Sequence, residues 1–182
     1  MSARSVGRRS FVRRTAELSA VTAATGVLFL GAMFGAFAVG APASAQALGR
    51  INDILILIAY PLAVPSLLAV GRVVRSDAPL GANLAIVVGL AAVTAIAILQ
   101  GLLVAEVLTF EQQVGPVSVA LLAFGASLLV LGDAARRAGV LPDGRRMGLV
   151  GATYVGYPIW AWWVARRLEG SAAAPAAPPT PT

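Results

Sequence analysis

The chain has 182 residues, of which 58% are apolar and only 12% charged, and its mean hydropathy is +0.83. A soluble domain usually carries about 25% charged residues, so this composition cannot cover a water-soluble surface and indicates a membrane protein. The net charge is +6, and all 14 basic residues are arginines. These arginines flank apolar runs, which favours a lipid bilayer as the partner and argues against nucleic acid.

Whole classes of chemistry are excluded by residue types that the chain lacks. It has no Cys, no His and no Lys. Disulfides, thiolate nucleophiles, His-held haem or zinc, Ser–His catalysis and Schiff-base cofactors therefore cannot occur. We expect no cofactor, no metal and no enzymatic activity.

In chain order, an Arg-rich N-terminus at 1–16 is followed by a bundle at 17–168 and by an Ala/Pro/Thr tail at 169–182 that we expect to be disordered. A membrane-spanning helix needs roughly 17–25 apolar residues. The apolar runs predict an all-α integral membrane bundle of five transmembrane helices. Their expected ranges are about 17–40, 51–70, 80–105, 116–135 and 147–165.

The N-terminus resembles a twin-arginine export signal. In that family's pattern a Ser or Thr precedes two Arg, and any residue, Phe, Leu and Lys follow; Arg8, Arg9 and Phe11 match it, whereas Gly7, Val12 and Arg13 depart from it. An Ala/Gly-rich apolar run follows, and 43–45 reads as an A-x-A cleavage site. The resemblance implies that residues 1–45 can be a signal, which if cleaved leaves four helices. The alternative is an uncleaved first helix.

Arginine placement predicts the orientation. If the N-terminus is cytoplasmic, every Arg except Arg50, Arg166 and Arg167 lies inside, as the positive-inside rule requires. Five spans then place the C-terminus outside the cell membrane. Three tryptophans before Arg166 are expected to form an interfacial aromatic belt, with a stacking platform for a ligand as the alternative: Trp160, Trp162 and Trp163.

The second predicted helix contains Tyr60, Pro61 and Pro65. Each Pro lacks an N–H, so the carbonyls of Leu57 and Pro61 lose their helical partners. In hydrocarbon these carbonyls need another partner. They could form a cation-coordinating notch in a small transporter or channel, although a structural kink is the simpler interpretation.

Polar residues near the expected outer surface are further candidates. Asp53 can cap the second helix, Gln100 can hydrogen-bond another helix, and Glu106 with Glu111 can solvate a loop. Paired carboxylates could alternatively bind a cation or act as acid and base in a lipid-modifying enzyme.

Small-residue stripes suggest close helix packing. Gly31 and Gly35 form one stripe, and Gly148, Ala152 and Gly156 form the other. Such stripes serve either a partner protein, a second copy, or packing within the bundle. Together with the missing catalytic residues, they favour a non-enzymatic accessory, scaffold or partner-binding subunit.

Overall fold

The computed structural model describes residues 3–75, 79–139, 141 and 143–170. Within these residues all regular elements are helices, which confirms the predicted all-α class. They are α1 (Ala3–Ala38), α2 (Pro42–Val74), α3 (Pro79–Val104), α4 (Phe110–Arg137), α5 (Gly144–Gly151) and α6 (Tyr157–Gly170). The expected tail lies outside the described residues from 171 onward, while its first two residues belong to α6.

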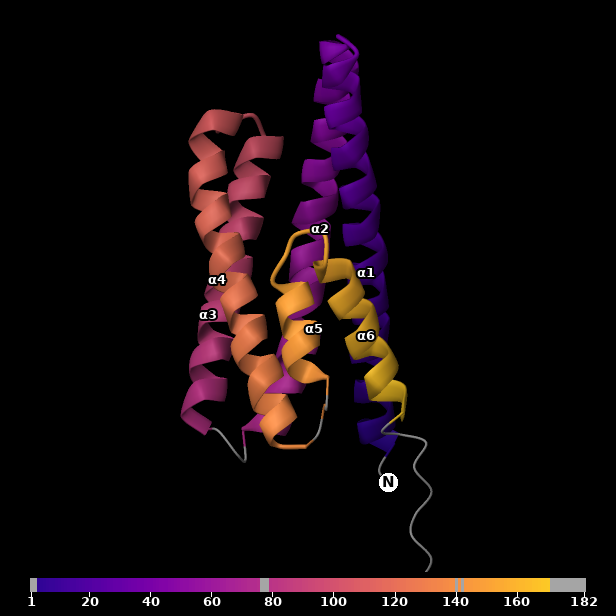
Figure 1. The fold of residues 1–182 in the computed structure, drawn as a ribbon, viewed down its shortest axis with the longest axis vertical. Coiled ribbons are helices and arrows are strands. Elements are labelled where there is room, and N and C mark those ends of the chain that lie inside the picture. Colours follow the sequence, from indigo (N-terminus) through magenta and orange to yellow (C-terminus); the bar gives the residue numbers. More distant parts are fainter. Residues whose placement is uncertain (1–2, 76–78, 140, 142, 171–182) are drawn as a thin grey trace, which may run out of the picture.

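In the described part of the chain, four helices, α1 to α4, are long and apolar enough to cross a membrane. They form two antiparallel hairpins, α1–α2 and α3–α4, whose turns lie at the same end of the molecule (Figure 1). We call this the turn end. The opposite end, where α1 begins, we call the arginine end. It also holds the last turn of α2, the last turn of α4 and the start of α5 (Figure 1).

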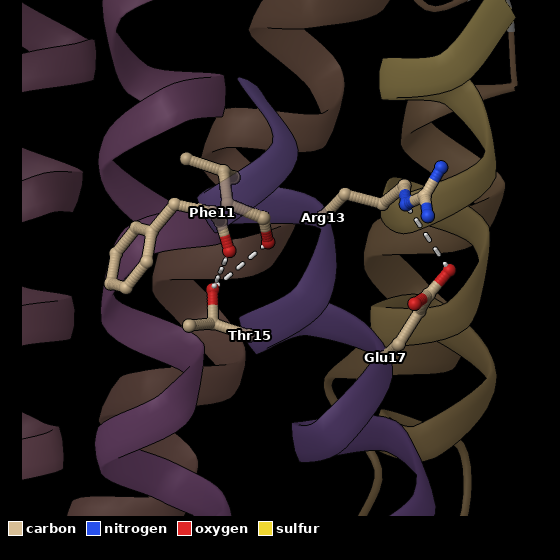
Figure 2. Close-up of polar contacts among 5 residues, drawn as sticks. Phe11, Arg13, Thr15 and Glu17 are labelled. Carbon is tan, nitrogen blue, oxygen red and sulfur yellow. Dashed lines mark hydrogen bonds and ion pairs between the residues drawn. The ribbon is translucent and has the colours of Figure 1, made fainter. Parts of the chain in front are cut away.

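Three helices begin clearly earlier than the hydropathy pattern predicts. α4 starts at Phe110 instead of 116, because a capping box on Thr109 stabilises its first turn. α1 starts at Ala3 instead of 17, because its Arg-rich start contains good helix formers and no Pro. Within it the Thr15 hydroxyl donates to the carbonyls of Phe11 and Val12, and Arg13 pairs with Glu17 one turn later (Figure 2). α2 starts at Pro42 instead of 51, since Pro needs no helical N–H partner in a first turn.

The prediction of one helix over 147–165 is wrong. The structure has two short helices there, α5 and α6, joined by the non-helical segment 152–156. Gly156 donates its N–H to the Thr153 hydroxyl at 2.9 Å, which closes this turn, and Pro158 sits in the first turn of α6. At about 1.5 Å per residue, neither helix reaches across a hydrocarbon core of about 30 Å.

α6 runs back toward the arginine end (Figure 1). Arg167, near its end, pairs with Asp143 at the start of α5 at 3.1 Å. The expectation that Arg166 and Arg167 lie opposite Arg145 and Arg146 is therefore wrong. The predicted fifth span is a helical hairpin that enters and leaves the bundle at one end.

An aromatic cluster joins α2, α4 and α6 in the core. The rings of Tyr60, Phe124 and Tyr157 lie with centroids 5.2 to 5.6 Å apart, and Trp160 stacks on Tyr157 at 6.1 Å. The hydroxyl of Ser19 on α1 bonds to the Tyr157 hydroxyl and donates to the Ala59 carbonyl on α2. This contact ties α1 to α6 and α2, so α1 is part of the core.

Glycines let α5 pack closely on α4. A Cβ on Gly148 would stand 2.7 Å from the Leu128 carbonyl oxygen, and one on Gly125 would stand 2.8 Å from that of Ala152. Gly132 and Gly144 face each other in the same way one turn further along. Between apolar helices in lipid, such backbone contact supplies van der Waals attraction where the hydrophobic effect is weak.

The Gly148→Ala variant should therefore be destabilised, by about 1–3 kcal/mol, because backbone atoms of α4 cannot move aside for a methyl group. The matched control is Gly101→Ala on α3, where a Cβ meets nothing within 4 Å and the change should be neutral or slightly stabilising. Loss of helical circular dichroism during unfolding in mixed micelles measures both. Equal midpoints for the two variants would contradict this packing.

Candidate functional site

A groove of about 870 Å³ opens at the turn end. Its walls come from the last turns of α1, the first turns of α2 and the segment joining α3 to α4. Apolar side chains cover most of it, including Leu30, Met33, Phe34, Leu103 and Phe110. Its polar lining includes Gln46, Arg50, Asp53, Glu106 and Glu111.

Asp53 stands at the groove wall beside a pair of glutamines that joins α3 to α4. The Gln113 amide on α4 donates to the Gln100 Oε1 on α3 at 2.8 Å, and the Gln100 side chain lies beside the Asp53 carboxyl on α2. Gln100 and Gln113 are buried, while Asp53 is half-buried. The hydrogen bond between Gln113 and Gln100 keeps the Gln100 side chain in place next to the carboxyl, since buried amides need hydrogen-bond partners.

Glu106 closes the α3–α4 turn and pairs across the groove with Arg50 at 2.7 Å. Its φ is +60°, and the N–H groups of Glu106 and Val107 donate to the carbonyls of Leu103 and Leu102. This is a Schellman motif with Glu at the position where Gly is usual. The ion pair between exposed side chains links α2 to this turn.

A second polar contact connects α2 to the segment between α5 and α6. The Tyr154 hydroxyl donates to the Asn52 Oδ1 at 2.9 Å, next to Asp53. Asn52 is buried and Tyr154 half-buried. This bond holds the non-helical segment against α2.

The structure brings together three of the predicted candidates and separates the others. Asp53 and Glu106 line the groove, and Gln100 is buried beside Asp53, although the sequence suggests separate capping, packing and loop roles for them. Tyr60 packs in the aromatic core. Pro61 is exposed on the outer side of α2, and Pro65 is half-buried. Helix α2 continues through both prolines.

The predicted tryptophan belt is wrong for Trp160, which is 3% exposed and packs against Gly151. Trp162 is exposed, Trp163 half-buried, and the guanidinium groups of Arg166 and Arg167 lie 4.6 and 5.9 Å from their rings. Such cation–π pairs are typical of a membrane interface. Here they lie at the arginine end of the bundle and not at the predicted outer surface.

The two small-residue stripes differ in the structure. Gly148 and Ala152 pack on α4, as in the bundle-packing interpretation. The predicted stripe ends before Gly156, which belongs to the turn after Thr153. A Cβ on Gly31 or Gly35 would meet nothing within 4 Å, and both glycines lie on an exposed face of α1.

Sequence reasoning missed the roles of Gln113 and Tyr154. Each is an uncharged polar residue within or beside an apolar helix, and such residues usually find a hydrogen-bond partner in the bundle. That signal could have marked both residues, but it could not have named their partners. Arg50 and Glu111 were recognised as flanking charges without a shared groove.

Comparison of the chain with protein-family models, with curated proteins and with solved structures finds no match. The function of the chain is therefore inferred from the geometry of the site.

The left-handed backbone at Glu106 generates a stability prediction. Glu106→Ala keeps the strain and loses the ion pair, whereas Glu106→Gly loses the pair but removes the strain. The Gly variant should be more stable than the Ala variant by about 1 kcal/mol, as measured by unfolding midpoints in the same micelles. An Ala variant as stable as the Gly variant would contradict this turn geometry.

Proposed function

We propose that this chain is a non-enzymatic, multi-pass membrane subunit that binds another transmembrane helix through one face of α1. The observation that carries the proposal is the unfilled glycine face of that helix. Gly125, Gly132, Gly144 and Gly148 each meet the backbone of a neighbouring helix within the bundle, whereas Gly31 and Gly35 meet nothing.

The face contains Ala24, Leu28, Gly31 and Gly35, which recur at helical spacing and are all exposed. Leu28 is 73% exposed. In the most apolar stretch of α1, 11% of the residues are buried, against 39% to 44% in α2, α3 and α4. A Gly-x-x-x-Gly face allows a second helix to approach closely in lipid.

The alternatives have less support. A transporter or channel at Pro61 and Pro65 needs freed carbonyls inside the bundle, but Pro61 faces outward. A lipid-modifying enzyme at the groove carboxylates has no metal cluster among the described residues to support it, and Glu106 is paired with Arg50. Non-catalytic binding of a helix requires only the exposed glycine face of α1, which the structure has.

Association is tested with variants of the face. Gly31→Leu combined with Gly35→Leu should lower the associated fraction about tenfold, because bulky side chains keep helices apart. The matched control, Gly101→Leu, changes a half-buried glycine of α3 where a Cβ also meets nothing within 4 Å. Native mass spectrometry after mild extraction measures a second copy or a co-purified protein.

Crosslinking gives an independent readout because the chain has no Cys. If the partner is a second copy, Leu28→Cys should form a disulfide-linked dimer in membranes. A wild-type chain that stays monomeric and brings no partner would refute the proposal.

The fold also supports a revised topology. Every arginine except Arg50 belongs to a segment at the arginine end, since α6 returns there. The positive-inside rule places this end in the cytoplasm. We therefore propose that both chain termini are cytoplasmic, and that residues 1–45 are retained because Ser19 is bonded in the core and Ala45 of the A-x-A sequence is buried in α2.

Single-cysteine labelling tests this orientation. Val107→Cys lies at the turn end and is accessible, since Val107 is 66% exposed; a membrane-impermeant maleimide should label it in intact cells. Ser10→Cys and Thr180→Cys should react only after permeabilisation. Labelling of Thr180→Cys in intact cells would instead support five spans.

A further inference from the structure

We propose that the groove at the turn end binds one hydrophobic organic cation, with its apolar part between α1 and the α3–α4 segment and its charge beside Asp53. This site is distinct from the partner-binding face of α1 and does not depend on it. Gly31 and Gly35 are absent from the groove lining, and they lie on a different side of α1 from Met33 and Leu30 by helical spacing.

The size and lining of the groove suit a compact hydrophobic molecule. Its volume of about 870 Å³ lies within the range of about 300–1,000 Å³ typical of small-molecule pockets. Three phenylalanines contribute to it: Phe34, Phe37 and Phe110. Aromatic faces attract cations as well as apolar groups, so the wall can contact both parts of such a ligand.

The charge of the lining selects a cation. Asp53, Glu106 and Glu111 contribute three carboxylates, against the single guanidinium of Arg50. Arg50 is already paired with Glu106, so an incoming anion would have to compete with a carboxylate 2.7 Å away. The net charge of the lining therefore attracts cations and repels anions.

Asp53 is the best-placed group for the ligand's charge. It is half-buried in the groove wall and lies beside the buried Gln100, which Gln113 holds in place. A carboxylate that is positioned before binding costs little entropy when a ligand arrives. No three acidic side chains of the described residues gather closely enough to hold a metal ion, and carboxylates spread along a groove suit a bulky cation better than a small one.

The test uses two ions of the same shape and opposite charge, tetraphenylphosphonium and tetraphenylborate. The full chain is placed in phosphatidylcholine nanodiscs, and binding of each labelled ion is measured by equilibrium dialysis against empty discs. We expect saturable binding of one tetraphenylphosphonium per chain, and only lipid partitioning of tetraphenylborate. Equal excess binding of both ions, or none of either, would overturn the proposal.

Variants locate the bound charge. Asp53→Asn and Glu111→Gln should each weaken tetraphenylphosphonium binding, about tenfold for Asp53→Asn, because a nearby unit charge is lost. Arg50→Gln should tighten it, since a repelling charge is removed; misfolding cannot produce that gain. The matched control is Asp133→Asn, which removes an acid that pairs with Arg136 and Arg137 at the other end of α4.

Asp133→Asn should leave the affinity unchanged. If Asp53→Asn binds like the wild type, or if Asp133→Asn weakens binding as much as Asp53→Asn does, the ligand does not occupy this groove. A melting curve of each variant in the same discs shows whether the bundle is intact, so a loss of binding without a loss of fold is assigned to the groove.

Discussion

Backbone polar groups within a lipid-embedded bundle must find partners in the protein, and the segment 152–156 is where this constraint is most demanding. Non-helical backbone is tolerated at membrane depth only where protein surrounds it. Here Thr153 satisfies the N–H of Gly156, and Tyr154 bonds Asn52 on α2. The turn is thereby attached to the neighbouring helix, and α6 can return along α1 to the arginine end.

That return decides the asymmetry of the molecule. It brings the α6 arginines to the end where the other arginine clusters lie, and it leaves Arg50 with the acidic residues at the turn end. One end of the bundle is therefore strongly basic, whereas the groove at the other end is acidic and apolar. One charge distribution can therefore orient the chain in a membrane through its basic end and attract a ligand of opposite charge to its acidic groove.

The glycines of α4 and α5 differ in their surroundings from Gly31 and Gly35 of α1. Glycines on α4 and α5 meet backbone to backbone, so this pair is complete without a further partner. α1 is held at its N-terminal half by Ser19 and Tyr157, while its Gly31–Gly35 face has no neighbour. Glycine thus allows close backbone contact between α4 and α5, whereas on α1 it leaves an exposed surface.

The sequence by itself determined the all-helical membrane class, the two hairpins α1–α2 and α3–α4, and the concentration of arginine, because composition and hydropathy are additive properties of each segment. The sequence did not determine the conformation of residues 147–165, because their length and apolar character also fit one membrane-spanning helix. Gly151, Gly156 and Pro158 signalled a break, but Asn52, more than a hundred residues away, provides a partner for it. Likewise Asp53, Gln100 and Glu106 were visible as polar residues one by one. Only tertiary structure could decide that Asp53 and Glu106 share a groove and that Gln100 is buried beside Asp53, since contacts between helices depend on register and distance rather than on local pattern.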